Sequence, residues 1–394
     1  METSPNSLPP YSLRELTGYF FKLGYSGFGG PVALVGAMHR DLVENRKWIT
    51  EEDYKEGLAL AQLAPGPLAA QLGIYIGFIH YRVLGATLAG ITFILPSFLM
   101  VVVLGMAYKA FGGLSWMQAI FYGVGAAVIG IILLSSYKLT IKSIGRLNQK
   151  SIIDNWMLWA FYLIALVITV LTESEEVLLF LAAGLIYMFF KSPPRQVNYS
   201  KAYIPLLLFA DTGFWNYEPE QLTKVGLFFL KTGAFVFGSG LAIVPFLHGG
   251  VVMENHWLTE TQFIDAVAVA MITPGPVVIT VGFIGYLIGG IAGATVASFA
   301  TFLPCYLFTV IPAPYFKKIA KMKSIKAFVD GITAAVVGAL MGSVLVITLR
   351  TIKDIPTFLI AVVSLLVLIY FKKIKEPVLI LLAAIIGITI KLLL

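Results

Sequence analysis

Eight apolar runs constrain the structure of this chain more than any other feature of its sequence. Each comes close to or exceeds the roughly 20 residues with which a helix crosses the hydrocarbon core of a bilayer. The runs lie near residues 86–111, 115–138, 154–172, 175–191, 292–312, 323–348, 355–372 and 376–393. They predict an all-α polytopic membrane protein that is held in a lipid bilayer by most of its surface.

The composition supports the same fold class. Of the 394 residues 58% are hydrophobic and 12% carry a charge, whereas a globular chain averages about 25% charged residues. So few charges cannot cover a soluble protein of this length, which excludes a soluble enzyme, a nucleic-acid-binding protein and a disordered scaffold. The net charge of +7 is explained by basic loops on the cytoplasmic side of a membrane, and we expect no nucleic-acid partner.

The sequence repeats itself after about 209 residues, which indicates a duplication. At an offset of 209 the equivalent residues include Lys22 and Lys231, Gly24 and Gly233, His39 and His248, Trp48 and Trp257, Glu51 and Glu260, and Pro65-Gly66-Pro67 and Pro274-Gly275-Pro276. At an offset of 208 they include Leu95-Pro96 and Leu303-Pro304, Gly123 and Gly331, and Gly130 and Gly338. We predict an N-terminal repeat over 1–190, a polar linker over 191–219 and a C-terminal repeat over 220–394.

Loop charges predict that the two repeats have opposite orientations in the membrane. The stretch 39–53 carries three basic residues, whereas its equivalent 248–262 carries none. The stretch 313–326 carries five, whereas its equivalent 109–115 carries one. Because basic loops stay on the cytoplasmic side, equivalent loops of opposite bias lie on opposite sides, which is the pattern of an inverted repeat.

An inverted repeat needs an odd number of crossings in each half, and we expect five. The first would lie near 12–30 and precede four clear apolar runs, which gives about ten transmembrane helices in all. The stretch 31–47 would lie along the membrane interface, and 51–84 would form a helical hairpin that enters the membrane and returns. The alternative makes the first element re-entrant and lets the Pro-Gly-Pro element cross.

A Pro-Gly-Pro turn interrupts an otherwise helical stretch in each half. A proline ends the helix before it and suits the first turn of the next helix. The N–H groups at the start of that second half-helix attract anions. We therefore predict substrate-binding residues at both turns, with a plain proline kink as the alternative: Pro65, Gly66, Pro67, Thr273, Pro274, Gly275 and Pro276.

Further residues of the predicted substrate site surround these turns. Glycine-rich turns let the backbone approach a ligand, lysines inside apolar stretches neutralise an anion, and polar side chains donate hydrogen bonds to it. The alternatives are tight helix packing, snorkelling lysines and hydrogen bonds between helices. The set comprises Lys22, Lys231, Gly29, Gly30, Gln62, Gln71, Gly238, Ser239 and Thr280.

Two carboxylates, Glu56 and Asp265, occupy equivalent positions in the second turn of the first half-helix. We expect them to pair with Lys22 and Lys231 when the site is empty, or to carry a proton. The alternative is a pair of interfacial carboxylates near a helix start.

Residues for other chemistries are missing from the sequence. Cys305 is the only cysteine, the four histidines show no metal-ligand spacing, and no nucleotide-binding, protease or nucleophile-elbow motif occurs. We therefore expect no enzyme activity, no catalytic residue, no metal and no cofactor.

The motif series resembles the chromate transporter family. It consists of Phe28-Gly29-Gly30-Pro31, Trp48, Gln62-Leu63-Ala64-Pro65-Gly66-Pro67 with Gln71, and Phe93-Ile94-Leu95-Pro96-Ser97, followed in the second half by Phe237-Gly238-Ser239-Gly240 and Thr273-Pro274-Gly275-Pro276. The resemblance covers roughly 12–348 and implies a multi-pass carrier of the cell membrane that exports chromate, an oxyanion similar to sulfate. Many members have a histidine where this chain has Leu34. Many members also have a basic residue at the position that Lys22 occupies in this chain.

The resemblance and the sequence together suggest alternating access, with a divalent oxyanion bound near mid-membrane between the halves. An interior-negative potential favours export of a dianion by about 4.6 kcal/mol per 100 mV, so export needs no coupling ion. An anion channel, a carrier for another anion such as sulfate and a lipid flippase are the alternatives. A homodimer is one candidate assembly.

Overall fold

The computed structural model describes residues 10–28, 30–173, 176–193, 221–236, 240, 243–316, 322–371, 374 and 376–393, and within these residues the regular structure is entirely helical. The first repeat contains α1 (Leu13–Ser26), α2 (Gly30–Met38), η1 (His39–Asn45), α3 (Glu51–Leu63), α4 (Leu68–Phe111), α5 (Ser115–Ser143), α6 (Gln149–Asp154), α7 (Trp156–Thr172) and α8 (Val177–Lys191). The second contains α9 (Gln221–Ala234), α10 (Ile243–His248), η4 (Gly249–Glu254), α11 (Glu260–Ile272), η5 (Val277–Ile279), α12 (Thr280–Val310), η6 (Ala313–Tyr315), α14 (Lys323–Thr351), α15 (Ile355–Tyr370) and α16 (Glu376–Leu393).

Several of these helices suit a bilayer. Among the described residues, four stretches are long and apolar enough to cross a membrane, namely Leu68–Phe111, Ser115–Ser143, Val277–Tyr315 and Lys323–Thr351. The shorter apolar helices α7, α8 and α15 accompany them. The expected all-α polytopic membrane fold is confirmed, and the total of about ten crossings stays a prediction.

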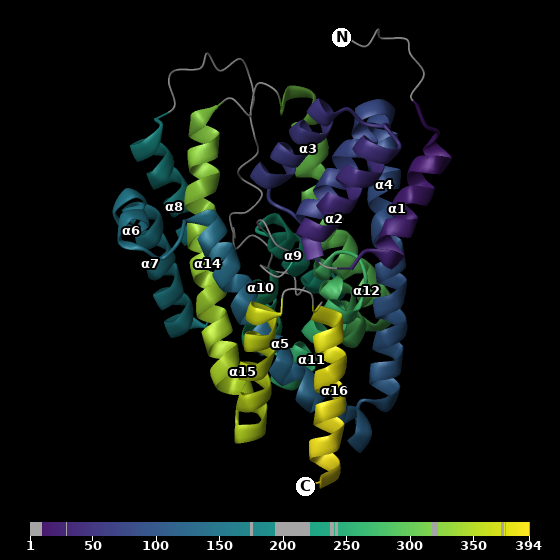
Figure 1. The fold of residues 1–394 in the computed structure, drawn as a ribbon, viewed down its shortest axis with the longest axis vertical. Helices are drawn as coiled ribbons and strands as arrows, with labels where there is room; N and C mark the ends of the chain where they lie inside the picture. Colours follow the sequence, from purple (N-terminus) through teal and green to yellow (C-terminus); the bar gives the residue numbers. More distant parts are fainter. Residues whose placement is uncertain are drawn as a thin grey trace.

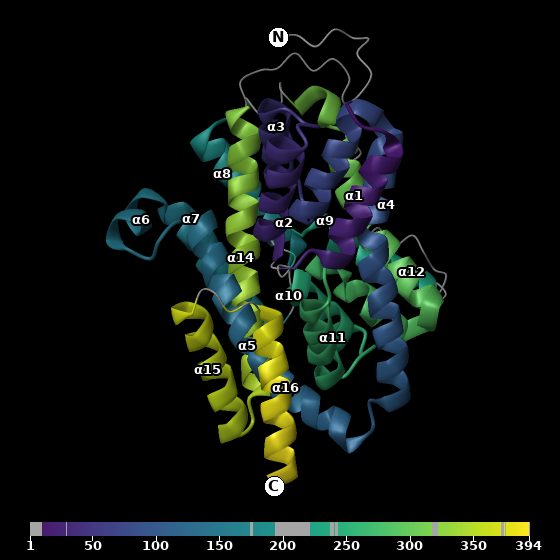
Figure 2. The ribbon, with the colours of Figure 1, turned by 45° about the vertical axis from the view of Figure 1, so that its right-hand side comes forward.

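Equivalent helices of the two repeats run in opposite directions. Helices α1 to α3 lie in the upper part of the molecule, whereas α10 and α11 lie below them and α16 ends at the lower end (Figures 1 and 2). Helix α5 starts at the lower end, where α4 finishes, and its equivalent α14 starts at the upper end (Figures 1 and 2). The two repeats are therefore inverted, as the loop charges predict.

The start of the chain differs from the expectation. Helix α1 has 14 residues, which at 1.5 Å per residue gives about 21 Å and falls short of a hydrocarbon core of about 30 Å. The helix ends at the cap residue Gly27, and the chain continues into α2 and η1, which stand beside α1 and α3. A short helix and a return therefore replace the crossing near 12–30 and the interface segment near 31–47.

The helical hairpin expected over 51–84 is present. Helix α3 leads to the Pro-Gly-Pro turn, and α4 then reverses direction at Arg82, whose φ of 51° and ψ of −138° are non-helical. The equivalent Gly290 has nearly the same angles, 61° and −147°. A Cβ added to Gly57 on α3 would lie 2.3 Å from the Tyr75 ring on α4, so the two arms of this hairpin pack closely. A Cβ added to Gly77 would lie 2.3 Å from the Gly85 carbonyl oxygen, so the backbone also packs closely across the reversal at Arg82.

The two repeats are joined because helices of each repeat pack against helices of the other. Helix α5 packs against α15 and α16 of the second repeat, while its equivalent α14 packs against α7 and α8 of the first. Glycines make these contacts close. A Cβ on Gly123 would lie 2.0 Å from the Ala383 carbonyl oxygen, and one on the equivalent Gly331 would lie 2.6 Å from that of Ala183. The repeated glycines therefore mark the packing surfaces between repeats.

Replacing Gly123 by leucine should destabilise the protein, because the new side chain collides with the backbone of α16. Overpacking of this kind costs about 1–3 kcal/mol. We expect a lower melting temperature for the variant purified in detergent. Gly18→Leu is the matched control, since no atom lies within 4 Å of a Cβ at Gly18. Equal melting temperatures for the two variants would contradict the proposed close contact.

Candidate functional site

The two Pro-Gly-Pro turns meet at one small cavity between the repeats. Its lining combines both turns with the two glycine-rich segments and comprises Pro31, Leu34, Pro67, Leu68, Ala69, Gly240, Gly275, Pro276 and Val277. The cavity volume is about 10 Å³, which holds at most one water molecule. The lining side chains are apolar, so any polar contact in this cavity comes from the backbone.

Each turn is bound to the opposite repeat by a backbone hydrogen bond. Gly66 N–H donates to the Val236 carbonyl at 2.5 Å, and Gly275 N–H donates to the Gly27 carbonyl at 2.8 Å. Val236 and Gly27 are themselves equivalent residues at the end of the first helix of each repeat. Because these two N–H groups are already bonded, the central glycines position the turns.

The residues that follow each turn line the cavity, with Leu68 and Ala69 from the first turn and Val277 from the second. In α4 the first intrahelical bond runs from Gln71 N–H to the Pro67 carbonyl, so the preceding N–H groups, including those of Leu68 and Ala69, have no intrahelical acceptor. Val277 has the equivalent place at the start of η5. Two half-helix N-termini therefore converge on one cavity, as the sequence predicts, and both have the polarity that attracts an anion.

Ser97 and Cys305 support the turns and were not selected by the sequence analysis as site residues. The Ser97 hydroxyl donates to the Pro274 carbonyl at 2.8 Å and lies 3.3 Å from the Gly24 carbonyl. The equivalent Cys305 is buried beside Gly66, where an added Cβ would lie 3.1 Å from the Cys305 Cβ. Both residues directly follow the repeated Leu-Pro pair, which is the signal that identifies them.

The predicted polar donors near the turns are mostly satisfied locally. Gln71 is buried, and its Nε2 donates to the Pro65 carbonyl at 2.9 Å. Thr273 donates to the Ala270 carbonyl at 3.0 Å, and Thr280 to the Val277 carbonyl at 2.7 Å. Gln62 is exposed on α3. These residues shape the turns, and their contact with a substrate stays a prediction.

The predicted lysines lie outside the cavity. Lys22 on α1 and Lys231 on α9 are both exposed, and Lys231 borders a separate small hollow that also contains Glu254. Gly30 begins α2 with a φ of +74°. The predicted site residues Gly29, Gly238 and Ser239 lie outside the described residues.

The two predicted carboxylates have tyrosine partners, so the expected pairing with the lysines is not what the structure shows. Asp265 is 3% exposed, and the Tyr108 hydroxyl on α4 of the other repeat donates to its Oδ2 at 2.7 Å. Glu56 forms a hydrogen bond with Tyr75. A hydroxyl donor lowers the cost of burying a carboxylate without adding a second charge.

A histidine–glutamate pair stands at the start of each hairpin and was missed by the sequence analysis. His39 Nε2 lies 2.8 Å from Glu51, and His248 Nε2 lies 2.8 Å from Glu260. The hydrogen bond from His39, followed by that from Lys55, lowers the pKa of Glu51. The signal was available, because both members of each pair recur 12 residues apart in the two repeats.

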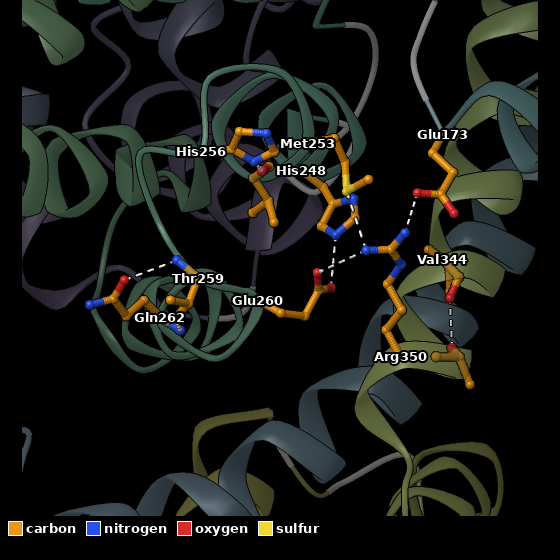
Figure 3. Close-up of polar contacts among 11 residues, drawn as sticks. Glu173, His248, Met253, His256, Thr259, Glu260, Gln262, Val344 and Arg350 are labelled. Atoms are coloured by element: carbon orange, nitrogen blue, oxygen red, sulfur yellow. Dashed lines mark hydrogen bonds and ion pairs between the residues drawn. The ribbon is translucent and has the colours of Figure 1, made fainter.

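The second of these pairs belongs to a larger polar cluster (Figure 3). Arg350 at the end of α14 forms an ion pair with Glu173 and lies 3.9 Å from the other oxygen of Glu260. The cluster borders a hollow of about 460 Å³ that also contains His256 and Gln262.

Replacing Gly275 by alanine should disrupt the site, because the new Cβ would lie 2.0 Å from the Ser97 Oγ and the φ of +97° disfavours a side chain. Strain of this kind costs about 1–3 kcal/mol. We expect a lower melting temperature, which the double variant Ser97→Ala with Gly275→Ala partly restores. Gly113→Ala is the control, since its Cβ meets nothing within 4 Å. Wild-type stability of Gly275→Ala would contradict the described contact.

Comparison with known proteins assigns the family. Residues 14–188 and 223–388 match the family model described as "Chromate transporter". A relative from Cupriavidus metallidurans named "Chromate transport protein" is 61% identical over 98% of this chain and 94% of its own length. "Probable chromate transport protein" of Synechococcus elongatus is 55% identical over 96% of each chain. A "Chromate transport protein" of Pseudomonas aeruginosa is 29% identical over 89% of this chain and 84% of its own.

No solved structure matches this chain. The family match covers both repeats, and it accompanies the motif series and the paired Pro-Gly-Pro turns described above. The chain therefore belongs to the chromate transporter family, whose members are membrane transporters and not enzymes.

Proposed function

We propose that this protein exports chromate across the cell membrane by alternating access, with sulfate as a competing oxyanion. The observation that carries the proposal is the convergence of two half-helix N-termini, one from each inverted repeat, on a single cavity. Close relatives named as chromate transport proteins support this choice of anion.

Electrostatics favours a divalent anion at this place. Each helix N-terminus acts as roughly half a positive charge, and the two ends together offer about one positive charge to the bound ion. Lys22 and Lys231 remain our candidates for further positive charge, reached when the surrounding helices move. Asp265, paired with a neutral tyrosine, is our candidate for a proton site.

The size of the cavity favours a carrier over an open channel. A space of about 10 Å³ is too small for a tetrahedral oxyanion. Binding therefore requires the two turns to separate, and a site that closes between binding events is what alternating access needs.

The direction of transport follows from charge. A dianion that leaves a cell with an interior-negative potential gains about 4.6 kcal/mol per 100 mV. We therefore propose export driven by the membrane potential.

The proposal also includes a homodimer in the cell membrane. Native mass spectrometry tests this assembly, because a dimer has twice the mass of the chain.

Chromate uptake into inverted membrane vesicles tests the proposal. For a carrier we expect a rate that saturates with chromate concentration and falls when sulfate is added in excess. An anion channel would instead give non-saturating flux and single-channel currents in planar bilayers. Vesicles from cells without the protein provide the background, and uptake no faster than this background would refute chromate transport.

The double variant Lys22→Ala with Lys231→Ala tests the predicted charges. If these lysines neutralise the anion during transport, we expect flux to fall by about tenfold or more, since one charged contact is worth roughly 1.5–3 kcal/mol. Lys224→Ala, an exposed lysine two turns earlier on α9, is the control. Wild-type flux in the double variant would remove both lysines from the site.

A further inference from the structure

Helices α3 and α11 are equivalent in the two repeats but differ in burial. Helix α11 buries every residue from Phe263 to Met271, whereas α3 buries only Tyr54, Gly57, Leu60 and Ala61. Helix α11 packs against α4 and α5 of the first repeat as well as α12, α14 and α16 of its own, while α3 packs mainly against α4 and η1. The protein is therefore closed around α11 and more open beside α3.

Four side chains form a polar cluster at the start of α11, which we call the α11 clasp: Glu173, His248, Glu260 and Arg350 (Figure 3). Arg350 on α14 pairs with Glu173, which follows α7 of the first repeat, and lies 3.9 Å from Glu260. Glu260 is the first residue of α11 and also contacts His248 at 2.8 Å. The clasp therefore ties the start of α11 to helices of both repeats.

The first repeat contains equivalents of three clasp residues, namely His39, Glu51 and Lys142, but they are not joined in one cluster. Lys142 is the penultimate residue of α5, as Arg350 is of α14, and Glu51 begins α3 as Glu260 begins α11. Glu51 contacts His39 at 2.8 Å and Lys55 at 3.1 Å. Lys142 is exposed and forms no ion pair with any residue that the structure describes.

We propose that Lys142 and Glu51 form a second gate, which closes when the α11 clasp opens. Inverted repeats exchange their conformations during alternating access, so contacts present in one repeat are expected in the other in the opposite state. The basic loop over 39–53 identifies the face of Glu51 as cytoplasmic. The α11 clasp is then the external gate, and this inference rests on the alternating access proposed above.

The competing explanation is that α3 is always exposed, because its sequence is more polar than that of α11. In that case Lys142 never approaches Glu51, and loss of the clasp does not change the accessibility of α11. Two measurements separate these explanations, and neither requires transport of chromate.

The first measurement uses a thiol-reactive, membrane-impermeant maleimide. In a Cys305→Ser background, Ala59→Cys on α3 and the equivalent Ala268→Cys on α11 serve as reporters. We expect labelling of Ala59→Cys in inverted vesicles and little labelling of Ala268→Cys from either side. Arg350→Gln should raise labelling of Ala268→Cys from the external side about threefold to fivefold, as for loss of a partly exposed ion pair.

The control for this measurement is Lys353→Gln, which removes an exposed positive charge three residues after Arg350. We expect no change of labelling in this variant. Equal labelling of Ala268→Cys with and without Arg350→Gln would overturn the assignment of the clasp as a gate.

The second measurement tests the approach of Lys142 to Glu51. In the same background, oxidation of the double variant Glu51→Cys with Lys142→Cys should form a disulfide, faster when Arg350→Gln opens the clasp. Glu51→Cys with Lys138→Cys, one turn earlier on α5, should cross-link more slowly. If Glu51→Cys with Lys142→Cys forms no disulfide, whether arginine or glutamine is present at position 350, the second gate does not exist. Absence of chromate flux in the wild type would instead contradict only the proposed function.

Discussion

The exchange of backbone hydrogen bonds between the two repeats is the interaction on which the site depends. A broken helix inside a membrane leaves polar backbone groups that lipid cannot satisfy. Here Gly66 donates to Val236 of the second repeat, and Gly275 donates to Gly27 of the first. Because each turn is held by the opposite repeat, the half-helices that follow are placed beside each other. Neither repeat could position this pair of N-termini alone.

Whole helices are also exchanged between the two repeats. Helices α5 and α14 each receive the last two apolar helices of the opposite repeat in glycine-lined contacts. Within a bilayer such close approach of backbones provides dispersion energy where a hydrophobic driving force is weak. The six helices packed in this way form a frame, and among the described residues the polar cluster at Arg350 joins this frame to the hairpin that begins with α11.

The repeat made much of this architecture predictable, because equivalent residues revealed the inversion, the hairpins and the paired broken helices. Hydropathy did not reveal that α1 ends at Gly27, since the apolar sequence continues past the turn. The tyrosine partner of Asp265 lies 157 residues away, a separation for which the sequence has no periodic signal. The exposure of Lys22 and Lys231 depends on how the short first helices rotate against their neighbours, which an apolar flank does not specify.

The exchanged packing has a consequence for how the chain is made. The surface of α5 at Gly123 and Gly130 is filled by α15 and α16, which the ribosome produces long after α5. Until those helices enter the membrane, the first repeat is inserted but unfinished, with a glycine groove turned to lipid or to a chaperone. The first repeat therefore stays unfinished until most of the second repeat has been made, and a nascent chain that stops after α14 lacks the partner that packs against its first half.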